Sequence, residues 1–232
     1  MFDYINFFLS RLFANAGFLS SVKEIIIIGS GSSVNAKINE ISSKAESVKT
    51  LTFNKAIIHL PVSIKIDIYL YEGSRNRNEL YQVINSLKSR KNTLVYIKLL
   101  PFLYRMPFRC YFSAAIWRFV FSSRKLFVIH RNRALNNDKV YFQSKGTMSL
   151  ILETLIESKS IESIRIIGLD LVGHYFWEKP RKNKSIHLTA KNGGIKILLN
   201  KLDILDNKLS NNNACVQIYS VNELLQSKYN TW

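Results

Sequence analysis

The fold class is best indicated by the sequence Glu24-Ile25-Ile26-Ile27-Ile28-Gly29-Ser30-Gly31-Ser32-Ser33. Four consecutive isoleucines are typical of a strand buried on both faces, as in a parallel sheet. The Gly-Ser-Gly-Ser-Ser segment predicts a tight turn, where glycines let the backbone approach a ligand and N–H groups can hold a phosphate. The turn lacks the third glycine of the dinucleotide-binding fingerprint and the Gly-Lys-Ser/Thr of a P-loop. A nucleotide-binding turn and an ordinary strand-to-helix turn therefore both fit this stretch.

Strand-like and helix-like segments alternate along the rest of the chain. Apolar runs of strand length occur at Val48–Phe53, Ile64–Leu70, Thr93–Leu99, Leu126–His130, Ser163–Ile167 and Cys215–Tyr219. Helical apolar spacing occurs at Glu79–Lys88, Gly146–Ser158 and Ile195–Leu209. This alternation predicts an α/β fold: a single Rossmann-like domain with a mainly parallel sheet flanked by helices and a short lid.

Length and charge limit the possible organisation and partners. The chain has 232 residues and a formal net charge of +17, which suits one domain and an anionic partner. Residues 1–22 predict an amphipathic helix, either packed on the domain or lying on a membrane surface. This stretch lacks the basic start of a secretory signal, and the two cysteines, Cys110 and Cys215, lie far apart. We therefore expect a cytoplasmic protein with reduced thiols.

The segment Lys98–Arg124 interleaves aromatic residues with arginines. Such a pattern can stack on nucleic-acid bases, or lie at a lipid interface where arginines meet phosphates. It also fits a helix that packs on the sheet with its basic residues outward. No zinc-ligand cluster, RNP-type motif or helix-turn-helix pattern supports nucleic acid, so a membrane or a lipid-linked substrate ranks above it.

Three further segments carry candidate chemistry. The sequence Gln143-Ser144-Lys145-Gly146-Thr147-Met148 precedes a predicted helix, where small hydroxyl residues and glycine favour an anion site. A predicted strand ends in Gly168-Leu169-Asp170, and ligands bind at the carboxyl ends of parallel strands. Asp170 can bind the sugar or cap a turn there. The polar, aromatic and basic segment 173–184 predicts a flap, and His187 follows it.

In their order and spacing, these segments resemble the bacterial CMP-sialic-acid-dependent sialyltransferases of glycosyltransferase family 42. The resemblance covers about residues 23 to 226. The family's Gly-Asn-Gly-Pro-Ser turn is similar to Gly29-Ser30-Gly31-Ser32-Ser33, and its nucleotide-contacting asparagine is similar to Asn54. Its Thr-Ser-Gly motif resembles Ser144-Lys145-Gly146, and its Ser-Gly-Ile-Asp-Phe-Tyr segment resembles the sequence from Ile167 to Val172. Ser30 replaces an asparagine and Val172 a tyrosine, so Kdo or another CMP-activated ulosonic acid is as plausible a donor sugar as sialic acid.

The resemblance implies roles for individual residues. His187 corresponds to the catalytic base, with His174 as the second candidate, and Tyr175 is the candidate that helps the departing phosphate. Residues 23–232 form the expected glycosyltransferase domain, with a lid at about 173–187. The expected nucleotide-sugar contacts come from Gly29, Ser30, Gly31, Ser32, Asn54, Ser144, Lys145, Gly146, Thr147, Gly168, Leu169 and Asp170.

The expected function is inverting transfer of a sialic-acid-like residue from a CMP-sugar to a cell-surface glycan such as lipopolysaccharide or capsule. No metal and no cofactor are expected, because a single phosphodiester charge does not demand a metal and no Asp-x-Asp motif resembles a metal site. The expected partners are the CMP-sugar, a glycan or lipid-linked acceptor and the anionic inner-membrane surface, on which the protein is peripheral. The alternative is a noncatalytic basic module that binds nucleotides or nucleic acid.

Overall fold

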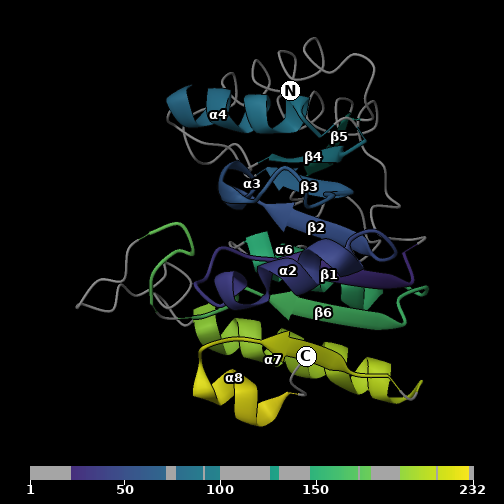
Figure 1. Cartoon of the computed structure of the whole chain (residues 1–232). Helices are drawn as coiled ribbons and strands as arrows, with labels where there is room; N and C mark the ends of the chain where they lie inside the picture. The colour runs from purple at the N-terminus through teal and green to yellow at the C-terminus, as the bar shows by residue number, and fades with distance from the viewer. Residues whose placement is uncertain are drawn as a thin grey trace.

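Seven parallel strands form one sheet in the computed structural model, which describes residues 22–71, 77–90, 92–99, 126–130, 147–171, 173–178, 194–212 and 214–229. The strand order is β5-β4-β3-β2-β1-β6-β7, and every neighbouring pair is parallel (Figure 1). The strands are β1 Glu24–Ile28, β2 Lys49–Phe53, β3 Ile68–Tyr71, β4 Leu94–Leu99, β5 Leu126–His130, β6 Ser163–Ile167 and β7 Val216–Tyr219. The predicted α/β, Rossmann-like fold is confirmed.

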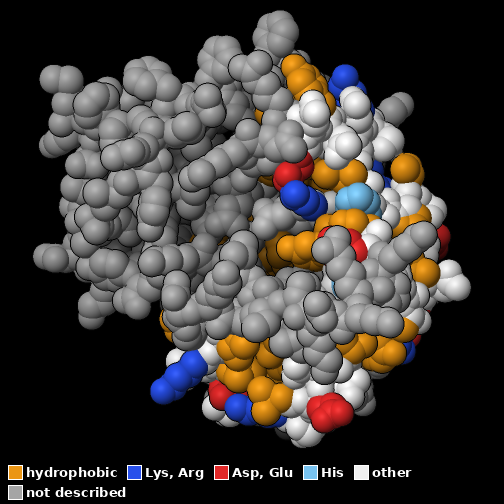
Figure 2. Space-filling model, turned by 90° about the vertical axis from the view of Figure 1, so that its left-hand side faces the viewer, with side chains coloured by type: hydrophobic (Ala, Val, Ile, Leu, Met, Phe, Trp, Pro, Cys, Tyr) orange, Lys and Arg blue, Asp and Glu red, His pale blue; other side chains and the backbone are white. Residues whose placement is uncertain are grey.

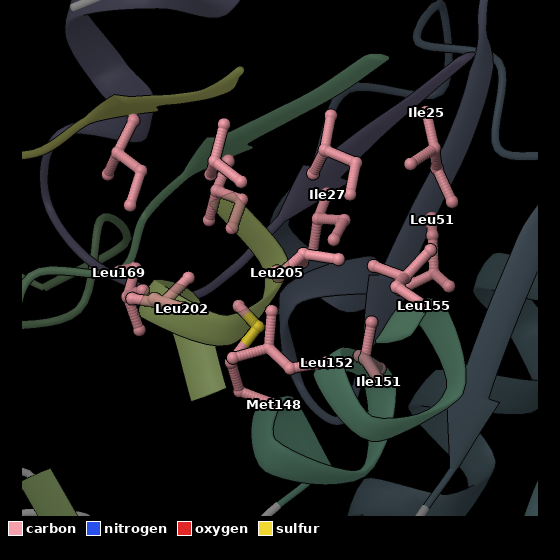
Figure 3. Close-up of a cluster of buried hydrophobic side chains, with 14 of the residues drawn as sticks. Ile25, Ile27, Leu51, Met148, Ile151, Leu152, Leu155, Leu169, Leu202 and Leu205 are labelled. Atoms are coloured by element: carbon pink, nitrogen blue, oxygen red, sulfur yellow. The ribbon is translucent and has the colours of Figure 1, made fainter. Parts of the chain in front are cut away.

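Helices cover both faces of the sheet. They are α2 Val34–Lys44, α3 Ala56–His59, α4 Arg77–Lys88, α6 Thr147–Glu157, α7 Gly194–Ser210 and α8 Glu223–Lys228. The isoleucines of β1 explain this arrangement, because all four are buried and alternate between two apolar clusters. Ile26 and Ile28 pack with α2 and α3, whereas Ile25 and Ile27 pack with α6 and α7. Figure 3 shows the second cluster, in which side chains of α6 and α7 meet those of β1 and Leu51 of β2.

The sheet reverses its direction of growth next to β1. The chain adds β2, β3, β4 and β5 on one side of β1 and then crosses to place β6 on the other side. The carboxyl ends of β1 and β6 therefore flank a topological switch point, where ligands bind in open α/β sheets. The arrowheads of β2 and β6 point to the left in Figure 1, and Figure 2 shows that side of the molecule, where hydrophobic side chains gather near the middle.

The third strand starts later than predicted. The apolar alternation predicts a strand over Ile64–Leu70, but β3 is Ile68–Tyr71. Side chains explain the difference, because they bond the carbonyls of this stretch: Ile64 accepts from Arg90 at 3.1 Å, Lys65 from Thr50 at 2.6 Å and Ile66 from Thr93 at 2.7 Å. These three carbonyls are hydrogen-bonded to side chains instead of to the backbone of a neighbouring strand, and β3 begins after them. The sequence also gives no sign of the four-residue helix α3 that precedes this loop.

Some predictions fall on residues that the structure does not describe. They are the N-terminal helix except its last residue, most of the aromatic and basic Lys98–Arg124 segment, and the part of the lid that follows residue 178. Among the described helices, none is both long enough and apolar enough to cross a membrane.

Candidate functional site

The turn that follows β1 lies directly against the end of β6. Gly29 N–H donates to the carbonyl of Ile167 at 2.7 Å, and Gly31 N–H donates to the carbonyl of Gly168 at 2.9 Å. A Cβ atom on Gly31 would lie 2.4 Å from Oδ2 of Asp170, a distance that atoms cannot adopt. The two glycines are therefore explained by the close approach of two loops at the switch point.

The carboxylate of Asp170 joins three loops at this edge of the sheet. Its Oδ2 accepts from Ser33 N–H at 2.7 Å, and its Oδ1 accepts from the Ser220 hydroxyl at 3.0 Å and Val221 N–H at 3.1 Å. The Ser32 hydroxyl adds a longer contact of 3.4 Å. The side chain is 1% exposed, and the N-terminus of α2 favours its negative charge. Of the two roles left open by the sequence, these contacts describe capping; contact with a sugar stays a prediction.

These hydrogen bonds change the picture of the phosphate-binding turn. The N–H groups of Gly29, Gly31 and Ser33 all donate to protein acceptors, so they are not available to hold a phosphate in this conformation. The Ser30 carbonyl also accepts a hydrogen bond, from Phe176 N–H at 3.0 Å. The turn is packed against its neighbours, and contact of Gly29, Ser30, Gly31 or Ser32 with a nucleotide stays a prediction.

Asn54 and Thr147 come together although they lie far apart in the sequence. Asn54 follows β2 with a left-handed φ of 51°, a conformation that asparagine tolerates better than most residues. Its Nδ2 donates to the Thr147 hydroxyl at 3.2 Å, at the first residue of α6. Its carbonyl accepts from the Tyr69 hydroxyl at 2.8 Å. Two predicted nucleotide-contacting residues therefore meet beside the switch point.

The backbone that leaves β6 is strained. Gly168, Leu171 and Gly173 have φ values of 75°, 27° and 115°, all in the left-handed region. Leucine rarely adopts such a conformation, and its buried side chain holds it in the core with α6 and α7. Strain of this kind persists where the surroundings fix it, and it is frequent at functional sites. Leu169 is also buried, and its carbonyl accepts from the Ser220 hydroxyl at 3.0 Å.

Tyr175 lies beside Gly31 in the turn that follows β1. It pairs with Gly31 in an antiparallel bridge, and its ring stacks on Trp177 with centroids 4.7 Å apart and planes 6° apart. The next residue, Phe176, is buried in the cluster formed by α2 and α3. The structure thus brings Tyr175 to the predicted turn, whereas Thr147 belongs to α6 on the opposite face of the sheet.

His59 and Trp177 are the residues that sequence reasoning missed. Their rings stack with centroids 4.2 Å apart and planes 13° apart. Burial lowers the pKa of His59 below its usual value, and the positive charge of Lys55 lowers it further. The sequence signal was limited to a histidine in a loop and a tryptophan in a flap, separated by more than a hundred residues.

Other predicted residues cannot be placed. Ser144, Lys145, Gly146 and His187 lie outside the described residues. Within the described ranges, no group of three or more histidine, cysteine, aspartate or glutamate side chains could hold a metal ion.

The chain is similar to known proteins in its fold and not in its sequence. No protein-family model and no curated protein matches the sequence. Two similar solved structures are a MAf glycosyltransferase from Magnetospirillum magneticum AMB-1 and the sialyltransferase CstII from Campylobacter jejuni in complex with cytidine-5'-monophosphate. The first has 14% identity and a TM-score of 0.50 over 86% of this chain, which spans only 32% of that protein. The second has 16% identity and a TM-score of 0.46, over 90% of this chain and 84% of the other.

Proposed function

We propose that the chain is a glycosyltransferase that moves a sialic-acid-like sugar from a CMP donor to a glycan acceptor. The observation that carries this proposal is the convergence of separate segments at one edge of the sheet. Gly31 lies against Gly168 and Asp170 at the switch point, and Asn54 contacts Thr147 beside it. The likeness of the fold to a glycosyltransferase supports the same class of enzyme.

The proposed donor site lies between the end of β2 and the start of α6. The side chains of Asn54 and Thr147 offer an amide and a hydroxyl there, both able to bind phosphate or ribose oxygens. The N-terminus of α6 is the positive end of its helix dipole, which favours a negatively charged phosphate. Three N–H groups of the first turn, those of Gly29, Gly31 and Ser33, already have protein acceptors, so we place the phosphate nearer to α6 than to that turn.

Thermal shift against nucleotides tests the donor. We expect CMP to raise the melting temperature and AMP and GMP to leave it unchanged. At a hundredfold excess over the dissociation constant, binding adds about 2.7 kcal/mol, or roughly 5–10 °C for a domain of this size. Equal shifts with all three nucleotides would remove the cytidine assignment.

The variant Asn54→Asp sharpens this test. Aspartate also tolerates a left-handed backbone, and the Thr147 hydroxyl can donate to it, so the fold is retained. The added negative charge repels a nearby phosphate, and CMP affinity should fall at least about tenfold. Asn207→Asp is the matched control, because Asn207 is exposed and its neighbour Asp206 bonds to the first residue of β7, at the opposite edge of the sheet. Equal CMP affinity in the two variants would exclude Asn54 from the site.

Turnover separates an enzyme from a noncatalytic binding module. We propose His187 as the base that deprotonates the acceptor hydroxyl. His187→Ala should leave CMP binding intact and lower turnover about 10²-fold or more, the usual contribution of a general base. EDTA should not change turnover. CMP binding without turnover on any CMP-sugar would favour the noncatalytic module.

A further inference from the structure

Residues 173–178 form a strap across the first turn of the site. Phe176 N–H donates to the Ser30 carbonyl at 3.0 Å, and the Phe176 carbonyl accepts from the Asn35 side chain at 2.8 Å. The bridge between Gly31 and Tyr175 adds a third connection. The turn is therefore held from two directions, by Gly168 and Asp170 on one side and by the strap on another.

Three stacked rings fasten the strap to the body of the domain; His59, Tyr175 and Trp177 are here called the aromatic clamp. Trp177 stacks on His59 of α3 at 4.2 Å and on Tyr175 at 4.7 Å, and the three ring planes are nearly parallel. Phe176 meets His59 and Trp177 edge-on, with centroids 6.4 and 4.8 Å away. Such aromatic pairs contribute roughly 0.5–1.5 kcal/mol beyond their buried area.

We propose that His59 and Trp177 are positioning residues, whose stacking holds the strap over the Gly29–Ser33 turn and so fixes the turn that lies beside the proposed donor site. The strap begins shortly after the strained residue Leu171, and a strained backbone keeps its conformation only where its surroundings fix it. Asp170 fixes the end next to β6, and the aromatic clamp fixes the other end.

The surroundings of His59 make the clamp sensitive to acid. Lys55, the N-cap residue of α3, is the charged group that acts on His59, and it pairs with Glu79 of α4 at 2.9 Å. From the strap, the rings of Phe176 and Trp177 contact His59. The pKa of His59 is lowered by burial and then by Lys55, so protonation of His59 is less favourable in the folded chain than in the unfolded chain. The stability that neutral His59 contributes is present above its unfolded pKa, about 6.5, and is lost as the pH falls through the lower folded value.

Hydrogen exchange of the full chain tests the clamp without any ligand. In Trp177→Leu and His59→Gln, the backbone amides of residues 29–36 should exchange about two- to tenfold faster, the range that one aromatic pair supports. Trp177→Phe and His59→Phe keep a flat ring and should stay within about twofold of the wild type. Amides of α7, which packs on the other face of the sheet from Phe176 and Trp177, serve as the control for global unfolding. Unchanged exchange at residues 29–36 in both ring-removing variants would overturn the proposal.

A pH titration of the wild-type chain tests the clamp without a disruptive variant. Below about pH 6.5, exchange at residues 29–36 should rise above the intrinsic pH dependence, and His59→Phe should not show this rise. Identical pH profiles for the two proteins would contradict a role for His59.

The consequence for binding rests on the proposed function. Trp177→Leu and His59→Gln should weaken CMP about two- to tenfold, and the two phenylalanine variants should restore the affinity. If the wild type binds no CMP, the proposed donor fails while the exchange data still decide whether the clamp positions the turn. Wild-type CMP affinity in the ring-removing variants, together with wild-type exchange, would reject the clamp and leave the donor assignment standing.

Discussion

Replacing Asp170 by asparagine should destabilise the domain much more than the same change at a surface carboxylate. An asparagine amide has one oxygen, so its NH₂ group must face either Ser33 N–H or Val221 N–H, both of which donate to the carboxylate at 2.7 and 3.1 Å. One buried N–H then loses its acceptor, which costs about 1–3 kcal/mol, and the remaining bonds lose their charged partner. We expect a total loss of about 2–4 kcal/mol in the free energy of unfolding.

The matched control is Asp203→Asn on α7. Asp203 is 37% exposed, pairs with Lys228 at 2.7 Å and accepts from the Tyr229 hydroxyl at 2.7 Å. An asparagine oxygen can still accept from that hydroxyl, and exposed ion pairs contribute only about 0–1 kcal/mol. Urea unfolding of the wild type and both variants measures the difference. If Asp170→Asn loses no more stability than Asp203→Asn, the carboxylate does not join the three loops as described.

Two further substitutions probe the same edge of the sheet. Gly31→Ala should cost about 1–3 kcal/mol in thermal or urea unfolding, because the new Cβ would lie 2.4 Å from the fixed Asp170 carboxylate; a variant as stable as the wild type would mean that the two loops separate easily. Tyr69→Phe should cost about 1–2 kcal/mol and weaken CMP binding, because it removes the hydroxyl that holds the Asn54 carbonyl at 2.8 Å. Tyr81→Phe is its control, since Tyr81 is 64% exposed and should change stability by less than about 0.5 kcal/mol; equal losses in the two tyrosine variants would contradict the role of Tyr69.

The sequence predicts several strands of the sheet at their observed bounds. The isoleucine run of β1 and the segments Leu126–His130 and Ser163–Ile167 match the observed strands residue for residue. The prediction of β3 is wrong at its start, because the apolar alternation of residues 64–67 continues through a loop whose carbonyls are bonded by the side chains of Arg90, Thr50 and Thr93. Local periodicity carries no information about such distant donors.

The sequence predicts which of these segments lie together better than it predicts their contacts. A small-residue turn, an asparagine and an aspartate follow the ends of three strands, and parallel strands bring their carboxyl ends together, as the structure has them. The carboxylate of Asp170 accepts hydrogen bonds from Ser33 and Ser220. These bonds depend on how three loops are placed in space, which cannot be predicted from any one of the three segments. The stacking of His59 on Trp177 is also a tertiary contact between segments with no shared pattern.

Release of CMP from CMP-activated sugars is the measurement that tests the proposed enzyme most directly. The chain should release CMP from at least one CMP-ulosonic acid, such as CMP-sialic acid or CMP-Kdo, in the presence of EDTA and an acceptor glycan, and the Asn54→Asp variant should release at least about tenfold less at a limiting donor concentration. UDP-sugars should give no nucleotide. Release from UDP-sugars that depends on Mg²⁺ or Mn²⁺, or no release from any CMP-sugar by a folded chain, would contradict the proposal.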